Sequence, residues 1–275
     1  TNVKASYVVI NQDNGDVINQ SKMNEKRLIA SITKVMTTYI IVNNLNMNDL
    51  VTVGDEIDKA HGSSIYLTKG ETLTVQDLLY GLMLRSGNDA ATVLAKYESG
   101  SVDEFVKKMN QVANEIGMKN TLFQNPTGLD DDGTENISTA YDMAILTKKA
   151  MENKMFRKVF KTKKYSCKSN KKSYVWYNKN KALSMSKYVT GGKTGYTKNS
   201  KRTLITTASK NNINLIVVTL NMSDDFNFHV NTYNDIFKKY HKYLILNKYD
   251  LGIQDKYYSK KENVDFYTKN NYYIL

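Results

Sequence analysis

The first residues whose types and spacing could do chemistry are a serine and a lysine three positions apart, Ser31 and Lys34. Apolar residues from Ser31 to Asn43 recur with helical spacing, which places both side chains on one face of an expected helix. A serine hydroxyl needs a base to become a nucleophile, and a lysine whose pKa is lowered can be that base. The helix N-terminus also favours negative charge near Ser31. In a lysine-rich chain the same spacing arises by chance, as an N-cap serine followed by a surface lysine.

A second polar group lies in Ser86-Gly87-Asn88, between two segments with helical patterns. A hydroxyl at Ser86 can relay protons, and the Asn88 amide can hydrogen-bond a carbonyl. By itself this motif is equally typical of a plain loop or a helix N-cap.

The third group is Lys193-Thr194-Gly195, which comes before an expected β-hairpin. Gly195 would let a substrate lie close against the edge of a strand. The hydroxyl of Thr194 and the cation of Lys193 suit a substrate carboxylate. The alternative is a glycine-rich turn, but not a Walker A loop, because Lys187 stands where that motif needs glycine.

These three motifs occur together and in a fixed order, which is far more specific than any one of them. Ser-x-x-Lys, Ser-x-Asn and Lys-Thr-Gly are the signature of penicillin-binding proteins and class A β-lactamases. The sequence resembles the D-alanyl-D-alanine carboxypeptidases, the low-molecular-mass penicillin-binding proteins of serine peptidase family S11. The resemblance covers nearly the whole chain, and its other blocks are residues 77–91, 117–129, 138–142 and 178–180.

The resemblance implies a serine acyl-enzyme mechanism on peptidoglycan stem peptides that end in D-Ala-D-Ala. Ser31 would attack the carbonyl between the last two residues, and Lys34 would take its proton. The backbone N–H groups of Ser31 and Tyr196 would hold the oxyanion. A β-lactam antibiotic would mimic the dipeptide and acylate Ser31 instead.

The same resemblance gives roles to the other two motifs. Ser86 and Lys193 would relay the proton to the leaving amine, and Asn88 would orient the peptide carbonyl. Lys193 and Thr194 would hold the terminal carboxylate, with Gly195 at the substrate-binding strand. Water would then hydrolyse the acyl-enzyme, and neither a metal nor an organic cofactor is needed.

Three departures from the family pattern concern the neighbours of these motifs. Ile29 stands where proline is usual, and Gly192 replaces an aliphatic residue. An arginine that helps to hold the terminal carboxylate in some relatives has no counterpart here. His229 lies nearest in sequence and is a candidate substrate contact, the alternative being an ordinary surface or helix-start histidine.

Other functions on the same fold stay open at different strengths. A class A β-lactamase would carry aspartate at position 87 and a deacylating glutamate, but the sequence has Gly87 and a loop of peptidase pattern at 125–137. A DD-endopeptidase carries the same motifs. A non-catalytic wall-binding protein would have lost a catalytic residue, and none is lost.

The charge of the chain first points toward nucleic acid. Its 275 residues hold 39 Lys+Arg and 27 Asp+Glu, a formal net charge of +12. Only four of the basic residues are arginine, the side chain that base readout and phosphate forks favour, so nucleic acid is not an expected partner. Most lysines are expected to be solvated, with attraction to an anionic polymer or membrane surface as the alternative. The single cysteine, Cys167, and three histidines exclude a disulfide and a classical zinc motif.

The motifs must be held by elements that the hydrophobic patterns predict. A hairpin is expected near the N-terminus around 13–15, a second hairpin joins 204–208 to 213–220, and a helix closes the segment at 231–243. Helical patterns fill the middle, at 31–43, 75–84, 89–97, 102–116 and 139–151. This order favours one antiparallel sheet with a helical insert. The resemblance implies the same α+β class, in the form of the transpeptidase fold shared by penicillin-binding proteins and β-lactamases.

We expect residues 1–241 to form the DD-peptidase catalytic domain and 242–275 to begin a small β-rich domain, truncated here. The first residues show no signal peptide, so the sequence is expected to be the mature form of an exported protein. The resemblance implies a place outside the cytoplasm, at the outer face of the membrane or in the cell wall. We also expect a Gram-positive source, a monomer, and peripheral membrane attachment of the full-length protein.

Overall fold

A five-stranded antiparallel sheet forms the centre of the computed structural model, which describes residues 4–130, 133–240, 243–246 and 272–274. Its strands in spatial order are β2 (Val17–Ser21), β1 (Ser6–Asn11), β11 (Ile213–Leu220), β10 (Lys201–Lys210) and β9 (Val189–Thr197). Tyr7 of β1 pairs with Thr219 of β11, so two strands that are about 200 residues apart in the sequence lie side by side in the middle of the sheet. This confirms the prediction of one sheet built from distant segments, and it leaves β9 as an edge strand.

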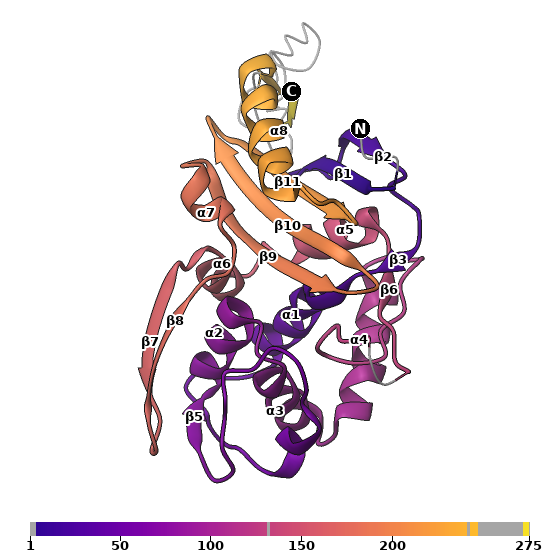
Figure 1. Ribbon diagram of the computed structural model, residues 1–275. Coiled ribbons are helices and arrows are strands. Elements are labelled where there is room, and N and C mark those ends of the chain that lie inside the picture. The colour runs from indigo at the N-terminus through magenta and orange to yellow at the C-terminus, as the bar shows by residue number, and fades with distance from the viewer. Residues whose placement is uncertain (1–3, 131–132, 241–242, 247–271, 275) are drawn as a thin grey trace, which may run out of the picture.

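Helices cover both faces of this sheet (Figure 1). On one face lies α8 (Asp225–Lys239), whose Tyr233 and Phe237 pack with Val9 and Val217 of the sheet. The other face carries a helical lobe, defined as α1 to α6 with their loops. Its helices are α1 (Lys34–Asn44), α2 (Val75–Arg85), α3 (Asn88–Ser99), α4 (Val102–Glu115), α5 (Ala140–Ala150) and α6 (Lys154–Lys161).

The ends of these helices follow local sequence signals. Thr74 and Asp77 form a reciprocal capping box at the start of α2. Gly117 follows α4 with φ +86°, a left-handed conformation suited to glycine. The helices α2 to α5 lie within two residues of the predicted ranges.

Helix α8 begins six residues earlier than the prediction of a helix at 231–243. Asp224, Asp225 and Asn227 read as turn residues in the sequence. In the structure Asp225, His229 and Tyr233 recur every four residues and form the buried face of the helix.

An element that the patterns did not predict is the two-stranded hairpin of β7 (Lys164–Lys168) and β8 (Ser173–Tyr177), which extends along one side of the lobe (Figure 1). Alternate residues of the hairpin face the lobe, and Tyr165 stacks on Tyr80 of α2 with ring centroids 3.7 Å apart. Lysines flank and interrupt the two strands in the sequence, which masked the alternating pattern. A short helix, α7 (Ala182–Met185), leads from the hairpin to β9.

Three pairs of short strands complete the described chain: β3 (Arg27–Leu28) with β6 (Ile137–Ser138), β4 (Leu50–Thr52) with β5 (Thr72–Thr74), and β12 (Tyr243–Leu246) with β13 (Tyr272–Ile274). The described chain also contains the 3-10 helices η1 (Ala30–Thr33) and η2 (Asp55–Lys59). Most of 242–275 lies outside the described residues, so a second domain there stays a prediction. Among the described residues, no helix combines the length and the apolar character needed to cross a membrane.

Candidate active site

The serine and lysine of the first motif meet at the junction of a 3-10 turn and a helix. Ser31 lies in η1, and Lys34 is the first residue of α1. The Lys34 Nζ atom lies 3.1 Å from the Ser31 Oγ atom, which is hydrogen-bonding distance. The helix therefore starts three residues later than expected, yet the two side chains still share one face.

Lys34 is completely buried, and its ammonium group is surrounded by acceptors. Nζ donates to Asn88 Oδ1 at 2.7 Å and to the Thr127 backbone carbonyl at 2.5 Å. Burial, followed by the charges of Lys193 and Lys179, holds the pKa of Lys34 well below its ordinary value. A lysine of this kind can accept a proton from the neighbouring hydroxyl.

A second lysine–serine contact joins the sheet to the lobe. Lys193 of β9 donates from Nζ to Ser86 Oγ at 3.0 Å, and both side chains are buried. Ser86 ends α2 in the left-handed conformation with φ +64°, which turns its hydroxyl toward the sheet. Burial, and then the charge of Lys179, lowers the pKa of Lys193 to about 7. The pair can therefore exchange protons near neutral pH.

The loop at 61–67 holds Asn88 in place beside Lys34. Asn88 Nδ2 donates to the His61 carbonyl at 2.5 Å, and the Asn88 backbone N–H donates to the Ser63 carbonyl at 2.7 Å. Its neighbour Asp89 is buried and accepts hydrogen bonds from the backbone N–H groups of Ile65 and Leu67. Asp89 thus fixes the loop whose carbonyls orient the Asn88 amide.

Gly195 lets the edge strand β9 run directly beside the nucleophile. A Cβ atom at position 195 would lie 2.9 Å from the Ser31 backbone nitrogen and 2.4 Å from Thr203 Oγ1. Both distances are shorter than a real Cβ contact tolerates. The motif therefore needs glycine because the backbones approach closely here.

These groups open onto one cleft. It is lined by Ser31, Ser63, Ser86, Lys179, Lys181, Thr194, Gly195, Tyr196, Arg202, Ser223, Asp224, Asp225 and Phe226. Arg202 pairs across the strands with Tyr196, and its Nε and Nη2 atoms donate to Asp225 Oδ1 at 3.2 and 2.6 Å. The guanidinium also lies over the Phe226 ring, 5.1 Å from its centroid. The cleft therefore carries a guanidinium fixed by Asp225, and Thr194 belongs to the same lining.

Comparison with known proteins identifies the family. The family model described as D-alanyl-D-alanine carboxypeptidase, peptidase family S11, matches residues 2–224. The chain belongs to peptidase family S11. The S11 relatives include the D-alanyl-D-alanine carboxypeptidase DacF of Bacillus subtilis, 39% identical over 224 residues, which cover 79% of this chain and 57% of DacF. The S11 chain thus spans little more than half the length of DacF.

Two other similar proteins have more of their length covered. The D-alanyl-D-alanine carboxypeptidase of Streptomyces sp. strain K15 is 35% identical over 219 residues, which cover 73% of this chain and 75% of that protein. The crystal structure of a D-alanyl-D-alanine carboxypeptidase from Mycobacterium tuberculosis H37Rv superimposes with a TM-score of 0.80 at 26% identity, covering 85% of this chain and 90% of that one. This structural similarity confirms the α+β fold that the resemblance implied.

The structure corrects the expectation that His229 contacts the substrate. His229 is completely buried between α8 and the sheet, where its Nδ1 and Nε2 atoms lie 2.7 and 3.0 Å from the hydroxyls of Thr206 and Thr219. Burial lowers its pKa to about 3, so the ring is neutral. It fails to reach the cleft because the second turn of α8 faces the sheet, whereas the first turn, with Asp225, lies at the cleft of this S11 protein.

Four residues at the site were missed from the sequence: Thr127, Lys179, Arg202 and Asp89. Thr127 acts through its backbone carbonyl, and a carbonyl leaves no mark on residue type. Lys179 and Arg202 are two among many basic residues, and only the folded chain brings them to the cleft. Asp89 directly follows Asn88, and Asp89, Thr127 and Lys179 all lie in the blocks that carry the resemblance (77–91, 117–129 and 178–180), which was the available signal.

Among the described residues, no group of three or more histidine, cysteine, aspartate or glutamate side chains could hold an ion. Cys167 is half-buried on the hairpin, and burial raises the pKa of its thiol to about 12, which makes it a poor nucleophile.

Proposed function

We propose that this S11 protein is a serine-type D-Ala-D-Ala carboxypeptidase that removes the terminal D-Ala from peptidoglycan stem peptides. One observation carries the proposal: the buried Lys34 amine lies 3.1 Å from the Ser31 hydroxyl, with its pKa well below the ordinary value. A nucleophile paired with a base of this kind is the requirement for acyl transfer. The family and the names of its relatives supply the substrate class.

In the acylation step the Ser31 oxygen forms a bond to the carbonyl carbon while its proton passes to Lys34. The negative charge moves to the carbonyl oxygen, which the backbone N–H groups of Ser31 and Tyr196 would stabilise. Strand β9 lies so close to the Ser31 backbone nitrogen that position 195 must be glycine. This closeness supports the proposed pair of oxyanion donors.

In the next step the bond to the leaving D-Ala breaks, and its amine must gain a proton. Ser86 and Lys193 are a suitable relay, because they contact each other and the pKa of Lys193 is lowered to about 7. Asn88 would orient the peptide carbonyl from its fixed position. Water then hydrolyses the ester and returns Ser31 to its free form.

The terminal carboxylate would bind at the end of the cleft that holds Thr194 and Arg202. Arg202 takes the place that His229 was expected to fill, since it lines the cleft and is held by Asp225. We predict that Arg202→Gln raises KM about 10-fold or more for a peptide ending in a free carboxylate. The amide of that peptide lacks the charge and should lose less than 2-fold. Equal losses on both peptides would exclude this role.

The test of the main proposal uses a fluorescent penicillin and a stem peptide ending in D-Ala-D-Ala. The wild-type protein should become covalently labelled and release D-Ala, and Ser31→Ala should do neither. Labelling of Ser31→Ala would mean a different nucleophile. Absence of both label and D-Ala in the wild type would overturn the proposal. Crosslinked muropeptides as a second substrate separate the alternative DD-endopeptidase, and persistence of the penicilloyl label separates a β-lactamase.

The setting of the activity follows from the substrate. The proposed substrate supports a position outside the cytoplasm, at the outer face of the cell membrane or in the cell wall. The Gram-positive source, the monomeric state and peripheral attachment of the full-length protein are predictions that accompany this proposal.

A further inference from the structure

The excess positive charge of the chain is concentrated in one continuous segment. Residues 153–223 contain 17 Lys+Arg and no Asp or Glu, whereas the rest of the chain contains 22 Lys+Arg and 27 Asp+Glu. The segment alone carries +17, and the remainder carries −5. The net charge of +12 is therefore distributed unevenly along the chain, with a strongly basic segment and a slightly acidic remainder.

The folded chain puts much of this segment on one side of the molecule. Figure 1 shows α6, the β7–β8 hairpin and α7 along the same flank, next to the edge strand β9. We call residues 161–177, the hairpin with its entry from α6, the lysine arm. Four of its lysines are exposed and have no ion pair among the described residues: Lys161, Lys163, Lys164 and Lys168.

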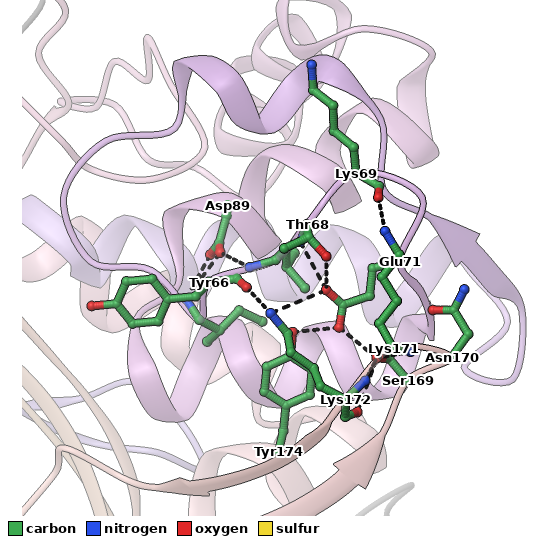
Figure 2. A network of polar contacts seen from close by, with 12 residues as sticks. Tyr66, Thr68, Lys69, Glu71, Asp89, Ser169, Asn170, Lys171, Lys172 and Tyr174 are labelled. Carbon is green, nitrogen blue, oxygen red and sulfur yellow. Dashed lines mark hydrogen bonds and ion pairs between the residues drawn. The ribbon is translucent and has the colours of Figure 1, made fainter.

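The lysine arm is held rigidly against the lobe. Its tip is anchored by Glu71, a completely buried carboxylate that accepts hydrogen bonds from Ser169 Oγ and Tyr174 OH, both at 2.7 Å (Figure 2). Its middle is fixed by the stacking of Tyr165 on Tyr80. The exposed lysines therefore project from a backbone that needs no ordering upon binding, which lowers the entropic cost of a contact.

We propose that the lysine arm binds an extended anionic polymer. Lys164 and Lys168 lie on the exposed face of one strand, about 13 Å apart along it, so they can reach successive charges of a linear chain. These lysines face solvent, and no acid in the described part of the chain forms an ion pair with them, which is the electrostatic footprint of a polyanion site. Direction also matters, because the arm leads through Lys179 into the cleft that holds Ser31.

A polymer fits this surface better than a membrane does. On the exposed face of the hairpin the cross-strand pairs are Lys164 with Tyr177, Ser166 with Val175, and Lys168 with Ser173. Only Tyr177 and Val175 are apolar or aromatic there, whereas an interfacial element normally buries a broad apolar face. The charges stand along a narrow ribbon, which suits a linear chain.

The experiment measures binding of long-chain sodium polyphosphate by fluorescence anisotropy at several salt concentrations. The test variant is Lys163→Gln/Lys164→Gln/Lys168→Gln. The matched control is Lys26→Gln/Lys59→Gln/Lys119→Gln, which changes the net charge equally at exposed lysines outside the segment. The arm variant should bind about 10-fold more weakly, and the slope of log K against log salt should fall by about 2. The control should change less than 2-fold.

Two results would overturn the proposal. Equal weakening by the arm and control variants would mean that net charge alone attracts the polymer. Binding to phosphatidylglycerol vesicles without binding to polyphosphate would make the arm a membrane contact. Unfolding temperature and penicillin labelling of each variant show that the fold and the cleft are intact. The binding assay needs no peptidase activity, so its result tests the lysine arm independently of the proposed function.

Discussion

At the scale of single residues, the site depends on two lysines that the fold keeps away from water. Lys34 and Lys193 are both buried, and each has a lowered pKa because burial penalises the charged form. Lys179 adds a further positive charge that acts on both. It lines the cleft, and its Nζ atom donates to Ser63 Oγ at 3.3 Å. Lys179 therefore belongs to the electrostatics of the reaction.

We predict that Lys179→Gln shifts the pH profile of acylation to more alkaline pH. Removing a positive neighbour raises the pKa of Lys34, which must be neutral to accept the proton of Ser31. The ascending limb of the acylation rate should move up by about half a pH unit. Rates of penicillin labelling from pH 5 to 10 measure it. Lys181→Gln lies in the same cleft and should leave the profile unchanged, and an acid shift in Lys179→Gln would contradict the argument.

Residue spacing predicted the chemical pairs of the site but not its distant contacts. Ser31 and Lys34 meet because a helical turn brings positions three apart together, and this is a local rule. The contact of Lys34 with the Thr127 carbonyl joins residues 93 positions apart and involves a backbone atom. The prediction that His229 contacts the substrate was wrong because its position in the sequence does not reveal which face of α8 packs against the sheet.

At the scale of elements, the edge strand β9 and the turn η1 form a tightly packed junction. Ala30 has φ +48°, in the left-handed region that residues other than glycine rarely adopt. A Cβ at Gly128 would approach the Ala30 carbonyl oxygen to 1.9 Å, and a Cβ at Gly195 would approach the next residue, Ser31. Gly128 and Gly195 thus allow two separate segments of backbone to pack directly against the turn that carries Ser31.

Gly195→Ala should therefore damage the reaction more than the fold. The added methyl pushes β9 away from the Ser31 backbone nitrogen, which misaligns the two oxyanion donors. We expect penicillin acylation to fall about 100-fold, the range seen when an oxyanion donor is lost. Stopped-flow labelling measures the rate, and thermal unfolding should change by only a few degrees. Full activity in Gly195→Ala would show that the close approach is not needed.

The anchoring of the hairpin by Glu71 predicts a pH-dependent stability. Burial tends to raise the pKa of Glu71, but hydrogen bonds from Tyr174 and Ser169 prevail and hold it below the ordinary 4.5. Glu71→Gln should lower the free energy of unfolding by about 2–4 kcal/mol at pH 7, because it leaves buried donors unpaired. A lowered carboxyl pKa gives a stabilisation that is fully present above pH 4.5 and is lost as the pH falls through the lower pKa of the folded state, so the difference in stability between wild type and variant should narrow in acid. Urea unfolding at pH 7 and pH 3.5 tests this, with Glu104→Gln, at an exposed ion pair, as the control.

At the scale of the whole molecule, sequence patterns predicted the layered plan but missed the hairpin on its flank. Two β-rich runs, 204–208 and 213–220, predicted β10 and β11, and helical periodicity predicted α2 to α5. The β7–β8 hairpin escaped because lysines flank and interrupt its strands in the sequence and only four aromatic or sulfur side chains face the lobe: Tyr165, Cys167, Tyr174 and Trp176. A buried stripe this narrow is difficult to separate from a basic loop.

The domain boundary leads to a prediction for a shortened chain. The cluster of buried residues under α8 ends with Phe237, and among the described residues the lining of the cleft ends with Phe226. A chain of residues 1–240 should therefore fold, unfold within about 5 °C of the longer chain and label with penicillin at the same rate. Thermal unfolding and labelling kinetics measure both. Loss of folding would mean that residues after 240 belong to the catalytic body.

The pairing of β1 with β11 also sets the order in which the protein can become active. Tyr7 cannot find its partner Thr219 until more than 200 further residues have emerged, and contacts of such long sequence separation form slowly. Ser31, Lys34 and Asn88 come early in the chain, but Lys193 reaches them only when the sheet closes. A chain that is still emerging therefore carries Ser31 in an unassembled site, and the site is complete only after nearly all of residues 6–220 have emerged.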